Sequence, residues 1–147
     1  MTRGGKKVKS KGGFTILEVV IAMAIIAIVT ATAASIMTSA QKSMARSQKS
    51  VLAANDIANI TECFKYTVGE GKGIDKFEQA VAFAFGLAPE GFTPTDTDGV
   101  YGLTRDGYVI TVTVTTGTEK TVNSVAKDGD GKVIFELTYH QASQEGV

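Results

Sequence analysis

The sequence is poor in the residues that crosslink or catalyse. Among its 147 residues there is one cysteine, Cys63, so no intrachain disulfide can form, and one histidine, His140. No serine, cysteine or acidic residue stands near His140 in a triad or metal-ligand spacing, and we expect a surface residue of a strand. We expect Cys63 to be a small apolar residue on a helix rather than a reactive thiol. The sequence predicts no enzyme and no cofactor.

Proline and glycine are absent from a long part of the chain. Neither residue occurs between Phe14 and Val68, and both prolines fall in the stretch from Leu87 to Gly99. Because these two residues are the usual breakers of helices, the simplest prediction for the first stretch is one helix of up to about 50 residues.

Charge is also absent from part of this predicted helix. The 23 residues from Val19 to Gln41 include no charged side chain. As a helix they reach about 34 Å, which exceeds the bilayer core of about 30 Å. The stretch is therefore predicted to span a membrane.

The two ends of the chain differ in charge. The first 13 residues contain five basic residues and no acid, namely Arg3, Lys6, Lys7, Lys9 and Lys11. Without these five, 10 of the 15 basic residues remain against 15 acidic residues, a net charge of about −5. By the positive-inside rule, a basic cluster beside an apolar run predicts a cytoplasmic N-terminus and an exported C-terminal part.

Glu18 is the exception within the apolar region. It stands four residues after Phe14, and Gly13, Phe14 and Thr15 precede it directly behind the basic segment. A carboxylate at the centre of a membrane helix costs about 2.5 to 3.5 kcal/mol and less near the end, so Glu18 is expected to have a function or a partner.

The basic leader, Gly13, Phe14, Thr15 and Glu18 together resemble the processing and assembly signal of type IV pilins and pseudopilins. The resemblance covers about the first 60 residues. It implies cleavage between Gly13 and Phe14 by a prepilin peptidase, N-methylation of Phe14, and assembly into a filament whose core is the apolar helix. In this family the carboxylate that corresponds to Glu18 pairs with the amine of Phe14 on a neighbouring subunit. Two buried opposite charges in contact offset much of the cost of burying each alone. Pairing of Glu18 with Phe14 within one chain stays open beside pairing between neighbours, since Glu18 one turn into the helix also favours the helix dipole.

The resemblance also implies partners. These are other pilin subunits in a homo- or hetero-filament, the prepilin peptidase, a pilus assembly platform and membrane lipid. DNA stays open as a partner, although no residue pattern indicates it. The single cysteine departs from the many pilins that close a C-terminal loop with a disulfide.

Other interpretations of the same segment stay open. Within the family, a pseudopilin of a type II secretion or competence (DNA-uptake) apparatus fits nearly as well as a pilus subunit. Outside it, a monomeric membrane protein with a ligand-binding head would need the anchor but no cut at Gly13. A secretory signal peptide cut near Ala31 to Ala34 is disfavoured, because the apolar run is long and contains Glu18.

Residues 42–67 are predicted to continue the helix in amphipathic form. Lys42, Arg46 and Lys49 fall on one face, which we interpret as solvated; contact with acidic subunits or anionic lipid is the alternative. A second face is apolar, and this face is expected to dock the head. Its residues are Ala53, Ile57, Ile60 and Phe64.

Residues 68–147 are predicted to form a globular head. Glycines end the long helix at 68–73, a short helix covers 74–85, and 87–99 is an irregular connector. Alternation of β-branched residues predicts four strands in an antiparallel meander at 100–104, 108–115, 120–126 and 132–139. On the last strand Val133, Phe135, Leu137 and Tyr139 are expected to share the face that packs on the helix. The predicted fold class is α+β, pilin-like, with 1–13 as leader and 14–41 as the membrane and filament-core helix.

Two segments rich in aspartate and glycine are weak candidates for calcium binding. They contain Asp96 and Asp98 in the connector, and Asp128 and Asp130 between the last two strands. Neither fits an EF-hand loop, since the second segment has Val133 where the loop needs glycine and Tyr139 at its twelfth position. We expect tight turns, which select the same residue types.

Overall fold

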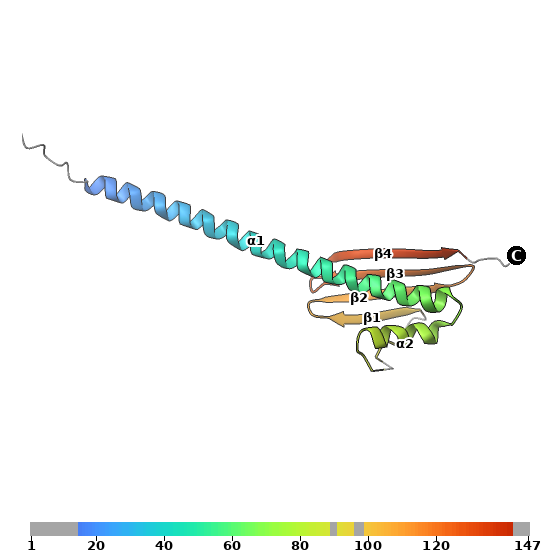
Figure 1. Ribbon diagram of the computed structural model, residues 1–147. Helices are drawn as coiled ribbons and strands as arrows, with labels where there is room; N and C mark the ends of the chain where they lie inside the picture. Colours follow the sequence, from blue (N-terminus) through green and yellow to red (C-terminus); the bar gives the residue numbers. More distant parts are fainter. Residues whose placement is uncertain (1–14, 89–90, 96–98, 143–147) are drawn as a thin grey trace, which may run out of the picture. The chain divides into compact units, whose positions relative to one another are not determined.

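A computed structural model describes residues 15–88, 91–95 and 99–142 (Figure 1). The chain divides into two compact units, Met1–Lys42 and Ser43–Val147, each of which is described by itself. Helix α1 runs over Ile16–Phe64 and continues as a short π-helical turn, η1, over Lys65–Gly69. The predicted long helix is confirmed, and it ends at the first glycine after Phe14.

The second unit contains a four-stranded antiparallel sheet. Its strands are β1 (Val100–Arg105), β2 (Tyr108–Thr116), β3 (Glu119–Asp128) and β4 (Val133–Ala142), in the order β1-β2-β3-β4. The predicted meander and the α+β, pilin-like fold class are confirmed. At the β1–β2 turn Gly107 has φ +87°, a conformation that residues with a Cβ rarely adopt.

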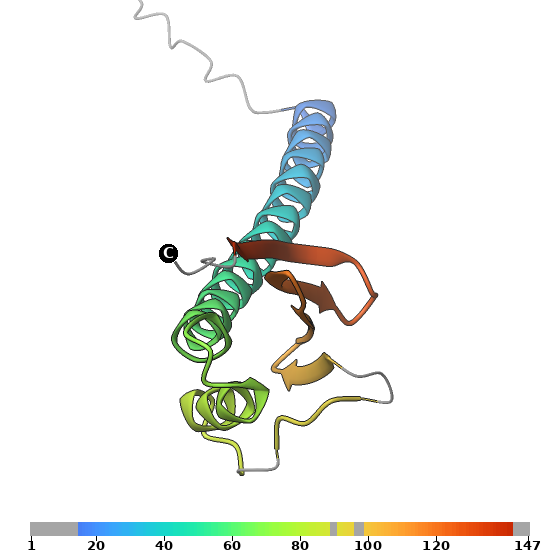
Figure 2. The same cartoon turned by 90° about the vertical axis from the view of Figure 1, so that its right-hand side faces the viewer.

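Both helical parts of this unit lie on the same side of the sheet (Figure 2). Alternate residues of β2 are buried, so one sheet face is apolar and the other carries threonines. The residues of α1 that reach this core are Ala53, Ile57, Ile60, Thr61 and Phe64. Phe64 makes edge-to-face contacts with Phe77 of α2 and Tyr139 of β4, with ring centroids 6.1 and 6.2 Å apart. The apolar face of α1 thus joins the helices to the sheet.

A β-bulge corrects one expectation for the last strand. Val133 pairs with Lys127, but the next paired residue, Phe135, faces Ala126, so Ile134 is an extra residue. Because an extra residue reverses the alternation of faces, Val133 turns away from the core and is 47% exposed, while Ile134 packs against it. The expectation that Val133 shares the core face was wrong.

Helix α2 covers Ile74–Ala84, close to the predicted range. Its buried residues are Phe77, Val81 and Ala82, whereas Ala84 is exposed. The connector supplies Phe92, which stacks on Tyr101 of β1 with centroids 4.7 Å apart. A second aromatic group therefore closes the β1 end of the core.

The C-terminal end of α1 is held by side chains from the sheet. Lys120 Nζ donates to the carbonyl oxygens of Val68 and Gly69, at 2.9 and 3.4 Å. Gln141 Nε2 also donates to Gly69 O, at 3.3 Å. A cation at the carbonyl end of a helix satisfies unpaired acceptors and complements the helix dipole. These bonds fix the end of α1 against β3 and β4.

A polar cluster ties α1 to the β1–β2 turn. The Asp56 carboxylate accepts hydrogen bonds from Arg105 Nε at 3.1 Å and from the Tyr108 hydroxyl at 2.7 Å. Two turns nearer the N-terminus, Lys49 Nζ donates to Gly107 O at 3.4 Å. Lys49 is therefore engaged with the head, while Lys42 and Arg46 are exposed.

The cluster predicts a pH dependence for the head. Burial, and then the bond to Asp56, raise the pKa of Tyr108 from its ordinary value of 10.0 to about 12. The folded head holds this proton more tightly than the unfolded chain, so this contribution to stability is complete below pH about 10 and is lost as pH rises through about 12. Titration by tyrosinate absorbance should show a component near pH 12 that belongs to Tyr108. This group should vanish in Tyr108→Phe and persist in Tyr66→Phe, which removes an exposed ring.

Candidate functional site

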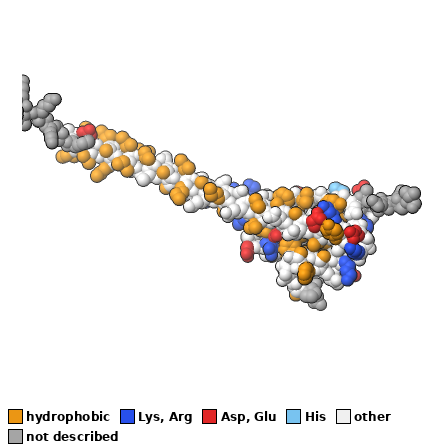
Figure 3. All heavy atoms as spheres, in the orientation of Figure 1, with side chains coloured by type: hydrophobic (Ala, Val, Ile, Leu, Met, Phe, Trp, Pro, Cys, Tyr) orange, Lys and Arg blue, Asp and Glu red, His pale blue; other side chains and the backbone are white. Residues whose placement is uncertain are grey.

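The N-terminal part of α1 is an exposed apolar surface. Ile16 is 86% exposed, and every residue from 15 to 42 is exposed within the described chain. Hydrophobic side chains cover the visible face of this segment (Figure 3). The helix is long and apolar enough to cross a membrane. Such a surface is not stable in water, so it fits membrane anchoring or burial among other apolar helices.

Three threonine side chains of this segment are satisfied within the helix. The hydroxyls of Thr32 and Thr38 donate to the carbonyl oxygens of Ile28 and Ala34, four residues back, each at 2.9 Å. The Thr30 hydroxyl donates to Ile26 O in the same way. Hydroxyl groups bonded to their own helix backbone need no other partner in an apolar medium. These three threonines therefore do not oppose burial of the segment.

Thr15 forms the N-terminal cap of α1. Its Oγ1 accepts a hydrogen bond from the Glu18 backbone N–H at 3.3 Å, and its carbonyl oxygen accepts from the same N–H at 3.0 Å. Thr15-x-x-Glu18 is the spacing of a capping box, in which the acid at the third helical position favours the helix start. This cap was not predicted from the sequence, although its residue types and spacing are visible there.

Glu18 lies in the first turn of α1 and is exposed. Among the described residues no ion pair involves its carboxylate. Gly13 and Phe14, for which the resemblance implies cleavage and methylation, lie outside the described residues.

The structure describes two of the four aspartates that were weak candidates for calcium binding. Asp128 Oδ1 accepts hydrogen bonds from the backbone N–H groups of Asp130 and Lys132, at 3.1 and 2.9 Å. This is the turn geometry for which aspartate is selected. Asp96 and Asp98 lie outside the described residues. In the described part of the chain, no three His, Cys, Asp or Glu side chains are grouped to hold a metal.

Four more residues singled out from the sequence lie in the second unit. Ile57, Ile60 and Phe64 are each 0% exposed and belong to the core. Cys63 is half-buried on α1, and burial raises the pKa of its thiol. These residues hold the head together rather than form a site for chemistry.

Comparison with known families agrees with the geometry of the first helix. The family model of the prokaryotic N-terminal methylation motif matches residues 8–34. Searches of curated proteins and of solved structures found no significant match. The chain carries the prepilin-type signal of type IV pilins, and Glu18 lies within the matched segment. This signal indicates a structural subunit rather than an enzyme, and it implies assembly with other pilins and processing by a prepilin peptidase.

Proposed function

We propose that this chain is the structural subunit of a type IV pilus-like filament. It is made as a membrane-anchored prepilin with a cytoplasmic leader, residues 1–13, and an exported head. The peptidase cuts after Gly13, and the subunit then polymerises through α1 into an extracellular filament. The observation that carries this proposal is an uncharged, exposed helical segment that begins within the methylation motif at residues 8–34.

The apolar segment of α1 is covered by lipid before assembly and by other helices after it. In the membrane, lipid tails cover the segment that ends at Gln41. In a filament, the same surface is covered by the helices of other copies, and no apolar side chain is exposed to water in either state. A plain anchor would explain the segment but would leave the Glu18 carboxylate without a partner.

In the proposed filament, Glu18 sets the axial alignment of neighbouring subunits. Processing creates a charged amine at Phe14, which must be neutralised when it enters the apolar core of a filament. The carboxylate of a neighbouring subunit meets this need only when the subunits are aligned along the axis.

Blocking the cleavage tests the proposal. Gly13→Glu places a bulky charged side chain next to the scissile bond, where the peptidase needs room to reach the backbone. We expect full-length precursor that remains in the membrane and forms no filaments, measured by immunoblot and electron microscopy. Gly12→Ala is the matched control one position upstream and should be processed normally. Filaments of normal number from Gly13→Glu would contradict the proposal.

A further inference from the structure

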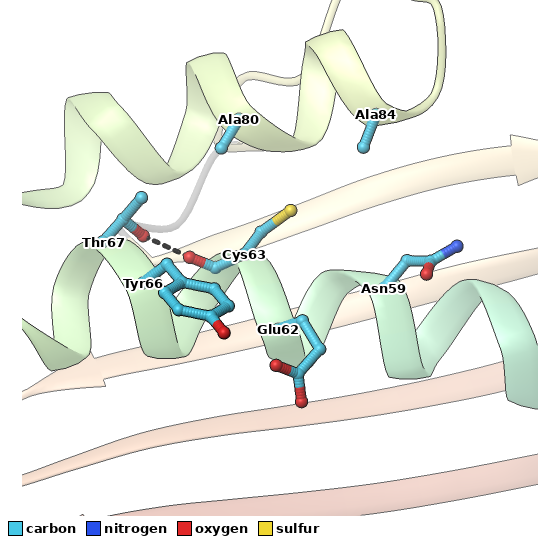
Figure 4. Close-up of a pocket in the computed structure, with 7 residues that line it drawn as sticks. All are labelled: Asn59, Glu62, Cys63, Tyr66, Thr67, Ala80 and Ala84. Carbon is cyan, nitrogen blue, oxygen red and sulfur yellow. Dashed lines mark hydrogen bonds between the residues drawn. The ribbon is translucent and has the colours of Figure 1, made fainter.

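An open groove lies on the head between the end of α1 and α2, with a volume of about 480 Å³. Figure 4 shows Ala80 and Ala84 projecting from α2 toward α1, with the sulfur of Cys63 directed toward them. The Thr67 hydroxyl is already bonded to Cys63 O at 2.6 Å. The floor of the groove is therefore formed by small side chains, and its one hydroxyl group is already engaged.

One wall of the groove is aromatic and acidic. Tyr66, which is 62% exposed, and Glu62 both line it. The Glu62 side chain is half-exposed, and its Oε1 accepts a hydrogen bond from Lys65 at 2.6 Å while Oε2 has no partner among the described residues. Lys65 is not among the groove residues and lies over the Tyr139 ring, 5.0 Å from its centroid. The groove thus suits a flat apolar side chain that arrives with a positive charge nearby.

The same head displays a side chain of this kind. Phe83 of α2 is 89% exposed, the highest value among the large hydrophobic residues of the described chain. Gln79 and Lys76 precede it by four and seven residues, which places them on the same face of α2. Lys76 Nζ donates to Gln79 Oε1 at 3.2 Å and makes no ion pair in the described part of the chain.

We propose that Phe83 of one subunit inserts into the groove of a second copy of this chain. The ring would pack on Ala80, Ala84 and the Tyr66 ring, where aromatic pairs gain from edge-to-face contact. Lys76 of the inserting subunit would then approach Glu62 of the receiving one, which gives charge complementarity at the rim.

The spacing of the two surfaces is compatible with this docking. Lys76 and Phe83 are seven residues apart on a helix, or about 10.5 Å. Glu62 and Tyr66, the residues that they would meet, are four residues apart, or about 6 Å. The long flexible side chain of Lys76 covers the difference, so the charge and the ring can be engaged at once.

Phe83 follows the groove residue Ala80 and precedes the groove residue Ala84 on α2, and the side chains of adjacent helical residues point about 100° apart, so each copy can give a ring to one neighbour and accept a ring from another. Such head-to-tail contacts add copies without closing into a dimer, as a filament requires. The inference rests on the proposed function for its setting, and it names the head surface through which neighbouring subunits touch.

The native thiol in the groove allows a direct test. In membranes and filaments from cells that make full-length Phe83→Cys, oxidation with diamide should join the new thiol to Cys63 of the neighbouring copy. We expect a ladder of dimers, trimers and larger species on a non-reducing gel, because every subunit carries both thiols. Mass spectrometry of the crosslinked peptides should identify the pair.

Three further variants distinguish a crosslink formed by docking in the groove from one formed by chance collisions. Adding Cys63→Ser should remove the ladder. Asp75→Cys, which places a thiol on the exposed first turn of the same helix, should give at least about tenfold less crosslink, as expected when a central contact is absent. Ala84→Leu in the Phe83→Cys background fills the groove from an exposed position and should also abolish the ladder, while the thermal unfolding of the head is kept.

The outcomes distinguish this inference from the proposed function. A ladder that persists without Cys63, dimers alone, or no crosslink in a preparation that contains filaments would each overturn the contact and leave the filament function standing. A ladder that depends on Cys63 in cells without filaments would support the contact and refute the filament. Absence of both would refute both.

Discussion

Glu18→Val should give a processed subunit that stays in the membrane and forms few or no filaments. Insertion should survive or improve, because valine removes the only charge from the apolar region after the leader. Cleavage should be little affected, since the scissile bond lies four residues upstream of the substitution. Assembly should fail because each amine of Phe14 would enter the filament core without its counter-ion. Breaking a buried pair costs about 3 to 5 kcal/mol, or a factor of about a hundred or more in subunit addition.

Glu18→Gln separates assembly from helix capping. Glutamine retains the capping-box side chain opposite Thr15 but has no charge. If the carboxylate pairs with the amine of a neighbour, Gln and Val should both abolish filaments. Filaments from Gln but not from Val would show that Glu18 acts through the helix start. Normal filaments from both variants would show that Glu18 is not the assembly group. Membrane fractionation and electron microscopy provide the two readouts.

Phe64→Ala should lower the free energy of unfolding of the head by about 3 to 5 kcal/mol. The ring is 0% exposed and lies between Phe77 and Tyr139, so its removal leaves a cavity where α1, α2 and β4 meet. We expect the fragment that begins at Ser43 to unfold cooperatively, which makes chemical denaturation the suitable measurement.

Phe83→Ala is the matched control for this substitution. It removes the same ring from a site that is 89% exposed in the isolated subunit, so its effect should be within about 0.5 kcal/mol. A loss below about 1 kcal/mol for Phe64→Ala would contradict the packing described here. A fragment without a cooperative transition would contradict the independence of the head.

The elements of the fold could be predicted because their signals are local. The absence of breakers up to Val68 predicted α1, and alternating β-branched residues predicted β2 over nearly its full length. In each case the apolar or β-branched residues recur along the sequence with the same period as the backbone of the element they form. The buried stripe from Ala53 to Phe64 follows the same rule.

What the sequence did not predict depends on contacts between distant residues. The bulge at Ile134 arises from the pairing of β4 with β3, and no residue type in β4 predicts it. The exposure of Ala84 and burial of Ala82 depend on the angle at which α2 meets the sheet. The cap on the end of α1 combines Lys120 and Gln141 from two strands, so it exists only after the meander forms.

The candidate site also has a part that could be predicted from the sequence and a part that could not. The motif around Glu18 was readable because its parts are contiguous, and the family match at residues 8–34 covers the same segment. The groove beside Cys63 was not readable, since it is formed by α1, η1 and α2 together.

The mass of the native N-terminal peptide tests the central claim most directly. Protein purified from the cells that make it should begin at Phe14 and carry one methyl group on the new amine. A chain that begins at Met1, or one cut near Ala34, would contradict the account of this protein as a processed filament subunit.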